Sequence, residues 1–178
     1  RTALGNFDVR LLIGPRSGSK TVNFSIPDRL APDLPQNLLD LRVARVDSTN
    51  STMEVPVKGV GTVHGWRERV EGKAETIIAD EEDFPVLVAQ GRLSYLAASG
   101  DKALLQRIAD QLIADAGLVP LSLPAGVRCR KRGGFRIYVN YAATAATLTP
   151  AADEAGYVLG GADMPAAGVT VARLATAG

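Results

Sequence analysis

The chain has 178 residues and a mass of 18.7 kDa, and it is 46% hydrophobic and 22% charged, as globular proteins are. Its formal net charge of +1 argues against a dedicated nucleic-acid binder, which carries a basic stripe. One Cys and one His exclude a disulfide framework and a multi-thiolate metal site and make a Ser–His–acid triad hard to build, so we expect no metal and no cofactor. The sequence contains no uninterrupted stretch of about 18 apolar residues, so no membrane span is predicted.

The first two thirds of the chain predict strands followed by one helix. Short apolar or alternating runs predict strands, and Gly91 predicts a turn between the last two of them. From residue 101 to 116, Leu104, Ile108 and Leu112 recur every four residues, with Ser99 or Asp101 able to cap the start of the helix. The expected strands cover residues 9–13, 41–47, 60–70, 74–79, 84–89 and 93–98.

The remainder of the chain predicts only short strands. Prolines at 120 and 124 mark a linker, so we expect a domain boundary near residue 120. Residues 127–132 and 135–141 alternate on either side of Gly133-Gly134, which is a strong hairpin signal. Further strands are expected at 144–148, 156–159 and 169–174, which together make a compact antiparallel β unit.

Residues 14–21 (GPRSGSKT) hold the densest group of small polar and cationic side chains. A phosphate-binding loop needs Gly directly before the Lys and a helix that starts there, whereas Ser19 precedes Lys20 and the following residues are extended. Nucleotide binding is therefore the weakest interpretation. The segment can instead line a cleft or form a simple solvated turn.

Two further groups of residues carry candidate chemistry. Alternation along residues 62–70 places His64, Trp66 and Glu68 on one face of a strand, where an aromatic ring can stack on a sugar or simply pack against a neighbouring strand. Arg67 and Arg69 fall on the opposite face. A basic run at 128–132 is typical of solvated hairpin surface, with Cys129 as a small buried residue within it.

The acidic residues do not form a motif. A retaining glycosidase needs two carboxyl groups about 5–5.5 Å apart, and nothing in the spacing of the glutamates marks such a pair. From its residues alone, the sequence predicts an α/β piece followed by a small β domain, without catalytic machinery.

The order of several segments resembles the carboxy-terminal portion of glycoside hydrolase family 42 β-galactosidases. The resemblance covers nearly the whole chain in one colinear order. It is carried by residues 10–21 (RLLIGPRSGSKT), 38–47 (LLDLRVARVD), 62–68 (TVHGWRE), the helix at 104–118, 126–141 (GVRCRKRGGFRIYVNY), 156–160 (GYVLG) and 165–173 (PAAGVTVAR).

This resemblance implies that residues 1–119 are the C-terminal part of an α/β flavodoxin-like trimerisation domain and residues 120–178 a small antiparallel β domain. In that family a preceding (β/α)₈ barrel carries an acid/base and a nucleophilic glutamate of a retaining mechanism. Neither has a counterpart in this chain, so the fragment is expected to be inactive alone and to belong to a cytoplasmic homotrimer that meets galactosides through the missing barrel. The chain is expected to begin mid-protein, since it opens on Arg1 without an initiator Met.

Within that family the three active sites close against neighbouring subunits, which makes loops of the trimerisation domain candidates for the cleft. Here the candidates are Arg16, Ser17, Ser19 and Lys20. The alternative from a different class is a stand-alone carbohydrate-binding or oligomerisation module. Its sugar-stacking residues would be Trp66, Tyr95, Tyr138 and Tyr141.

Overall fold

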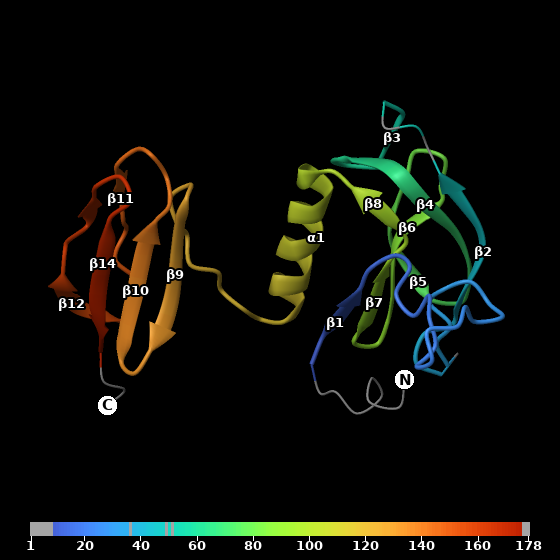
Figure 1. Ribbon diagram of the computed structural model, residues 1–178, viewed down its shortest axis with the longest axis horizontal. Helices are drawn as coiled ribbons and strands as arrows, with labels where there is room; N and C mark the ends of the chain where they lie inside the picture. The colour runs from blue at the N-terminus through green and yellow to red at the C-terminus, as the bar shows by residue number, and fades with distance from the viewer. Residues whose placement is uncertain (1–8, 36, 49, 51, 176–178) are drawn as a thin grey trace. The chain divides into compact units, whose positions relative to one another are not determined.

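The computed structural model describes residues 9–35, 37–48, 50 and 52–175, and the chain divides into two compact units, Arg1–Leu118 and Val119–Gly178 (Figure 1). The described residues form fourteen strands and a single helix, so β-structure predominates over helix. The assignment of residues 1–119 and 120–178 to particular domains of a larger enzyme stays a prediction.

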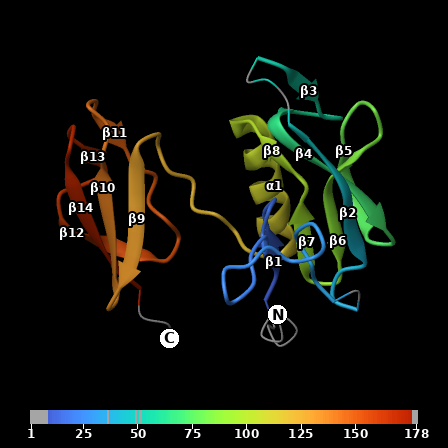
Figure 2. The same cartoon turned by 45° about the vertical axis from the view of Figure 1, so that its right-hand side comes forward.

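Unit 1 contains two sheets that enclose most of its core. The first sheet has the order β1-β7-β6-β5 and the second the order β2-β4-β3, with β8 paired to β4. Figures 1 and 2 show these sheets lying against each other, with α1 beside β8. The elements are β1 (Leu11–Ile13), β2 (Leu41–Ser48), β3 (Glu54–Pro56), β4 (Thr62–Gly72), β5 (Glu75–Ala79), β6 (Pro85–Gln90), β7 (Leu93–Leu96), β8 (Ala98–Gly100) and α1 (Lys102–Asp115).

The core of unit 1 has two clusters, which the alternating strands and the apolar stripe of α1 supply. One cluster brings Val63 of β4, Leu87 of β6 and Leu104 of α1 together between the sheets. The other surrounds Leu39 and Tyr95, both fully buried, at the β2 and β7 side. These side chains come from distant segments and pack closely, which fixes the positions of β4 and β7. Both strands also carry polar residues of the candidate site.

Helix α1 confirms the prediction for residues 101–116. Asp101 caps it by accepting a hydrogen bond from the Leu104 backbone N–H at 2.8 Å. Gly117 follows the last turn at φ +65°, a left-handed conformation that suits glycine. Leu104 and Ile108 lie in the core, as the four-residue spacing predicts.

The topology of unit 1 differs from the expected α/β arrangement. Among the described strands, only β1 and β7 pair in parallel, while every other pairing is antiparallel. A doubly wound fold needs several parallel strands joined by helices. The partial flavodoxin-like domain is therefore not confirmed.

Unit 2 is an all-β unit, and its hairpin is the predicted one. β9 (Val127–Arg132) and β10 (Phe135–Asn140) pair across Gly133-Gly134, and both glycines have positive φ. The sheet has the order β12-β14-β10-β9, and a two-stranded sheet β11-β13 accompanies it. The other elements are β11 (Ala146–Thr147), β12 (Glu154–Leu159), β13 (Asp163–Met164) and β14 (Val169–Leu174).

Candidate functional site

Strand β4 presents two chemically different faces, as its alternation predicts. On one face the Trp66 indole Nε1–H donates to Glu68 Oε1 at 2.9 Å. On the other, the guanidinium groups of Arg67 and Arg69 lie near the ring of Phe84. The strand therefore separates a cationic network from a mixed aromatic and acidic surface.

Glu68 is the polar centre of the second surface. It is only 2% exposed, and its carboxylate accepts three hydrogen bonds from three separate segments. Oε1 accepts from the Arg16 backbone N–H at 3.1 Å as well as from Trp66, and Oε2 accepts from the hydroxyl of fully buried Tyr95 on β7. Such bonds satisfy a buried carboxylate that would otherwise be costly.

Burial, together with the hydrogen bond to Glu68, raises the pKa of the Tyr95 hydroxyl well above its ordinary value. Tyr95 therefore stays protonated throughout the physiological range and remains a donor to Glu68. Because Glu68 also holds the Arg16 backbone, it ties the loop after β1 to the two sheets of unit 1.

The loop after β1 turns sharply at Arg16, whose backbone has φ +63°. This conformation brings the Arg16 guanidinium over the Trp66 ring, 4.9 Å from its centroid, a cation–π contact. A hollow of about 290 Å³ opens beside this pair. It is lined by Arg16, Ser19, Lys20, Ile26, Leu30, Ala31, Val46, Trp66 and Glu68.

Three of the four predicted cleft residues meet at this hollow. Arg16, Ser19 and Lys20 line it, whereas Ser17 is half-buried and does not. The sequence did not single out Glu68 as their anchor. The only signal was the alternation that placed Glu68 on the same face as Trp66.

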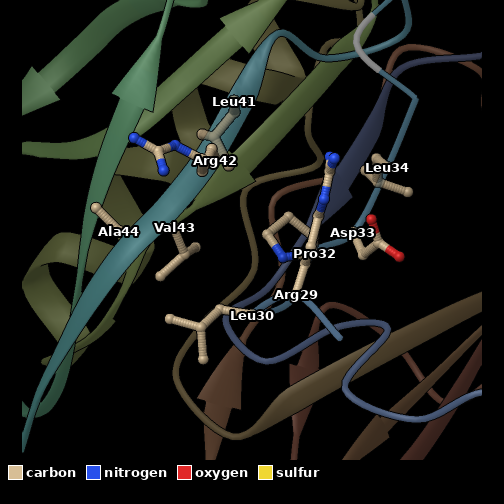
Figure 3. A pocket seen from close by; sticks show the side chains of 9 residues that line it. All are labelled: Arg29, Leu30, Pro32, Asp33, Leu34, Leu41, Arg42, Val43 and Ala44. Atoms are coloured by element: carbon tan, nitrogen blue, oxygen red, sulfur yellow. The ribbon is translucent and has the colours of Figure 1, made fainter. Parts of the chain in front are cut away.

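A second hollow of about 500 Å³ adjoins the first, since Leu30 lines both. Figure 3 shows it between the start of β2 and the segment that runs from Arg29 to Leu34. Arg29, Asp33 and Arg42 supply its charged groups. The loop between β1 and β2 therefore borders two hollows that have Leu30 in common.

The geometry around residues 14–21 does not suit a phosphate-binding loop. Ser19 N–H donates to the Arg16 carbonyl at 3.1 Å, so the loop closes on itself as a turn. No helix follows it within the described residues before α1, so no helix N-terminus is available for a phosphate. In the same described part of the chain, no group of three acidic, His or Cys residues could hold a metal ion.

Two of the four proposed sugar-stacking residues are wrong. Tyr95 and Tyr138 are 0% and 1% exposed, because each packs into the core of its unit and donates its hydroxyl to a glutamate. Trp66 is half-buried at the hollow, and Tyr141 is exposed. Only these two rings can reach a ligand.

The basic run of unit 2 lies on the surface, as predicted. Arg128, Arg130, Lys131 and Arg132 are all exposed on edge strand β9. Cys129 alternates with them and packs, half-buried, against the core of unit 2. No helix in the described part of the chain is long and apolar enough to cross a membrane.

No protein-family model matches the chain, but individual proteins do. It is 40% identical over 153 residues to a β-galactosidase of Thermus thermophilus, covering 84% of this chain and 24% of that protein. A second β-galactosidase, from a Thermus species, is also 40% identical over 154 residues, covering 85% of this chain and 24% of that protein. The chain therefore spans about a quarter of the length of the curated relatives it matches.

Solved structures of β-galactosidases also match the chain. A β-galactosidase from the psychrophilic Marinomonas ef1 matches with a TM-score of 0.88 and 33% identity, over 97% of this chain and 26% of that one. A GH42 β-galactosidase from G. stearothermophilus matches with a TM-score of 0.74 over 92% of this chain and 28% of that one, but at 14% identity it shows only a shared fold. The resemblance to the carboxy-terminal part of a β-galactosidase is thus confirmed.

Proposed function

Because the chain is homologous to the carboxy-terminal part of β-galactosidases, we propose that it is the non-catalytic assembly portion of such an enzyme. The complete enzyme would hydrolyse terminal non-reducing β-D-galactosides by a retaining mechanism with two glutamates, both on a (β/α)₈ barrel outside this chain. The observation that carries the proposal is the 40% identity over 84% of this chain, against 24% of the relative's length.

The buried carboxylates of the chain support a non-catalytic role. A retaining mechanism needs two carboxyl groups facing one another across the scissile bond, one protonated and one ionised. Here each buried carboxylate is held by its own donors: Glu68 by Tyr95 and Trp66, and Asp80 by Arg67 at 2.8 Å. Donors of this kind join these carboxylates to other segments of unit 1, and neither is shown facing a second carboxyl group as a retaining mechanism requires.

Exposed apolar side chains on the loop after β1 support an assembly role. Val22, Phe24 and Ile26 are each at least 80% exposed. Three large apolar side chains exposed within five residues of one loop are typical of a segment that another surface covers. We infer that unit 1 belongs to a trimerisation domain and that this loop, with Arg16, Ser17, Ser19 and Lys20, lies at the wall of the substrate cleft in a homotrimer.

The location proposed for the enzyme is the cytoplasm. Cys129 forms no disulfide, which suits a reducing compartment. No nucleic acid is expected as a partner, since the formal net charge is +1.

The Thermus thermophilus relative provides the test. We expect a variant that lacks the matched 153-residue segment to lose its assembly and its hydrolysis of a nitrophenyl β-galactoside. Replacing the segment with this chain should restore both, as measured by light scattering and by release of nitrophenol. A deletion variant that keeps the parent's number of subunits and full activity would contradict the proposal.

The second candidate function is a stand-alone carbohydrate-binding or oligomerisation module without catalysis. One observation favours it: Trp66 lines a hollow that also contains polar side chains. Under this alternative, the presence of the chain makes no difference to the activity of the deleted relative.

A further inference from the structure

We propose that the hollow beside Trp66 is a binding subsite for a single sugar unit of a galactoside, with Trp66 as its apolar wall and Glu68 as its polar anchor. The choice of a galactoside rests on the proposed function. The existence of the subsite rests on the geometry of the hollow.

The size of the hollow suits one pyranose ring. Pockets for drug-sized ligands span roughly 300–1,000 Å³. The hollow at Trp66 measures about 290 Å³, just below that range, and Leu30 lines both it and the larger hollow of about 500 Å³. A terminal sugar can therefore occupy the smaller hollow, with the remainder of a galactoside directed toward Leu30.

The lining matches the two-sided chemistry of a sugar. The indole of Trp66 and the aliphatic side chains of Ile26, Leu30 and Val46 provide an apolar wall for the C–H groups of a pyranose. The hydroxyl of Ser19 and the cations of Arg16 and Lys20 can bond to its oxygens. An anionic phosphate would instead meet the carboxylate of Glu68 on the same wall.

Glu68 has capacity for one more hydrogen bond. An ionised carboxylate offers about four acceptor positions, and three of these are occupied by Arg16, Trp66 and Tyr95. Since Glu68 also lines the hollow, its remaining position on Oε2 can accept a bond from a sugar hydroxyl. A charge-assisted bond of this kind is strong in a buried setting, and the three donors already fix the direction of the carboxylate.

The contact between Arg16 and Trp66 orients the wall of the subsite. The guanidinium lies 4.9 Å from the ring centroid, and the Arg16 backbone is bonded to Glu68. The ring, the cation and the carboxylate therefore form one connected unit. Binding in the hollow must change the surroundings of the indole.

The experiment follows tryptophan emission, because Trp66 is the only tryptophan in the chain. Galactose and methyl β-galactoside are titrated into the complete chain, with glucose as the comparison sugar. We expect a saturable change in emission for both galactosyl ligands, with at least tenfold weaker binding of glucose. No saturable change with galactose would overturn the subsite, and an equal response to glucose would overturn its assignment to galactosides.

Two variants of the hollow and one control variant locate the binding. Ser19→Phe fills the hollow and should abolish the response, whereas Ser122→Phe places the same ring at an exposed position of the linker and should leave it unchanged. Glu68→Gln removes the charge of the anchor and should weaken galactose binding at least tenfold. Circular dichroism confirms that the variants fold.

A galactose response that persists in both Ser19→Phe and Glu68→Gln would place binding elsewhere and overturn the proposal. These outcomes do not depend on the deletion and replacement experiment on the relative. Failure of the subsite is therefore distinguishable from failure of the proposed function.

Discussion

The ion pair between Arg67 and Asp80 provides the sharpest test of what stabilises unit 1. Asp80 is fully buried and Arg67 is 7% exposed, and Arg67 Nη1 lies 2.8 Å from Asp80 Oδ2. The other Asp80 oxygen accepts hydrogen bonds from the backbone N–H groups of Glu82 and Phe84 at 3.0 and 2.9 Å. Asp80→Ala therefore removes the main partner of a buried cation and two bonds that close a turn.

The expected loss of stability follows from this geometry. Removing one partner of a buried ion pair costs about 3–5 kcal/mol, because the remaining charge is left uncompensated. Arg67 keeps weaker contacts with Glu82 at 3.3 Å and Asp47 at 3.6 Å, which places the loss at the lower end, about 3 kcal/mol. With a urea dependence of about 1.5 kcal/mol per molar, the unfolding midpoint should fall by about 2 M.

The assay is urea unfolding followed by the emission of Trp66, which lies in unit 1 and is the only tryptophan. The matched control is Glu71→Ala, which breaks the ion pair between Arg42 and Glu71, whose side chains are 70% and 58% exposed. Solvent screens this pair, so its loss should cost less than about 1 kcal/mol. Equal midpoints for the two variants would refute the reasoning, as would a loss below about 1 kcal/mol for Asp80→Ala.

Three further predictions concern packing and pH. Leu104→Ala should lower the free energy of unfolding in urea by about 3–5 kcal/mol, because Leu104 is fully buried. Leu105→Ala, at an exposed position, should lower it by under about 1 kcal/mol. Similar losses for the two variants would contradict the core assignment. Gly61→Ala should destabilise unit 1 by more than about 2 kcal/mol, since a Cβ there would lie 2.7 Å from the Leu104 backbone nitrogen at φ +91°; an unchanged midpoint would refute this contact. Burial and a hydrogen bond to Glu154 raise the pKa of Tyr138 to about 12. Because the folded state holds this proton more tightly than the unfolded state, Tyr138 stabilises unit 2 below about pH 10, and this contribution is lost as the pH rises from about 10 to 12. In Tyr138→Phe, the melting temperature of unit 2 should fall less steeply over that range, and an identical slope would contradict the assignment.

Local patterns in the sequence predicted the elements that depend on neighbouring residues. The hairpin around Gly133-Gly134 and the helix with Leu104 and Ile108 were found, because turn chemistry and apolar spacing act over a few residues. The alternation of β4 correctly separated Trp66 from Arg67. In each case one stretch of chain contains the whole signal.

Features that join distant segments were not predictable in this way. Glu68 and Tyr95 are 27 residues apart, and nothing in either neighbourhood marks their hydrogen bond. The two buried tyrosines were proposed as sugar-stacking groups because composition does not distinguish an exposed ring from one whose hydroxyl is satisfied in the core. The turn at Gly91 correctly indicated the antiparallel pairing of β6 and β7. The other sheet pairings of unit 1 were not predictable, since an isolated strand carries no record of its partner's direction.

The candidate site was predictable in part. A cluster of small polar and cationic residues indicated a loop that lines a cleft, and Arg16, Ser19 and Lys20 line a hollow, while their place in a substrate cleft stays a prediction. The inner wall of the hollow was missed, because Glu68 lies 52 residues from Arg16, whose backbone N–H donates a hydrogen bond to it. Only folding brings the loop, β4 and β7 to one point.

The central claim, that this chain contributes to a galactosidase without performing the catalysis, is tested most directly by a hydrolysis assay. The purified chain is incubated at high concentration with a nitrophenyl β-galactoside, with the Thermus thermophilus β-galactosidase as the positive control. We predict no release of nitrophenol above the buffer rate, because each buried carboxylate of the described residues is held by its own donors. Release that saturates with substrate and disappears when the chain is unfolded would contradict the account.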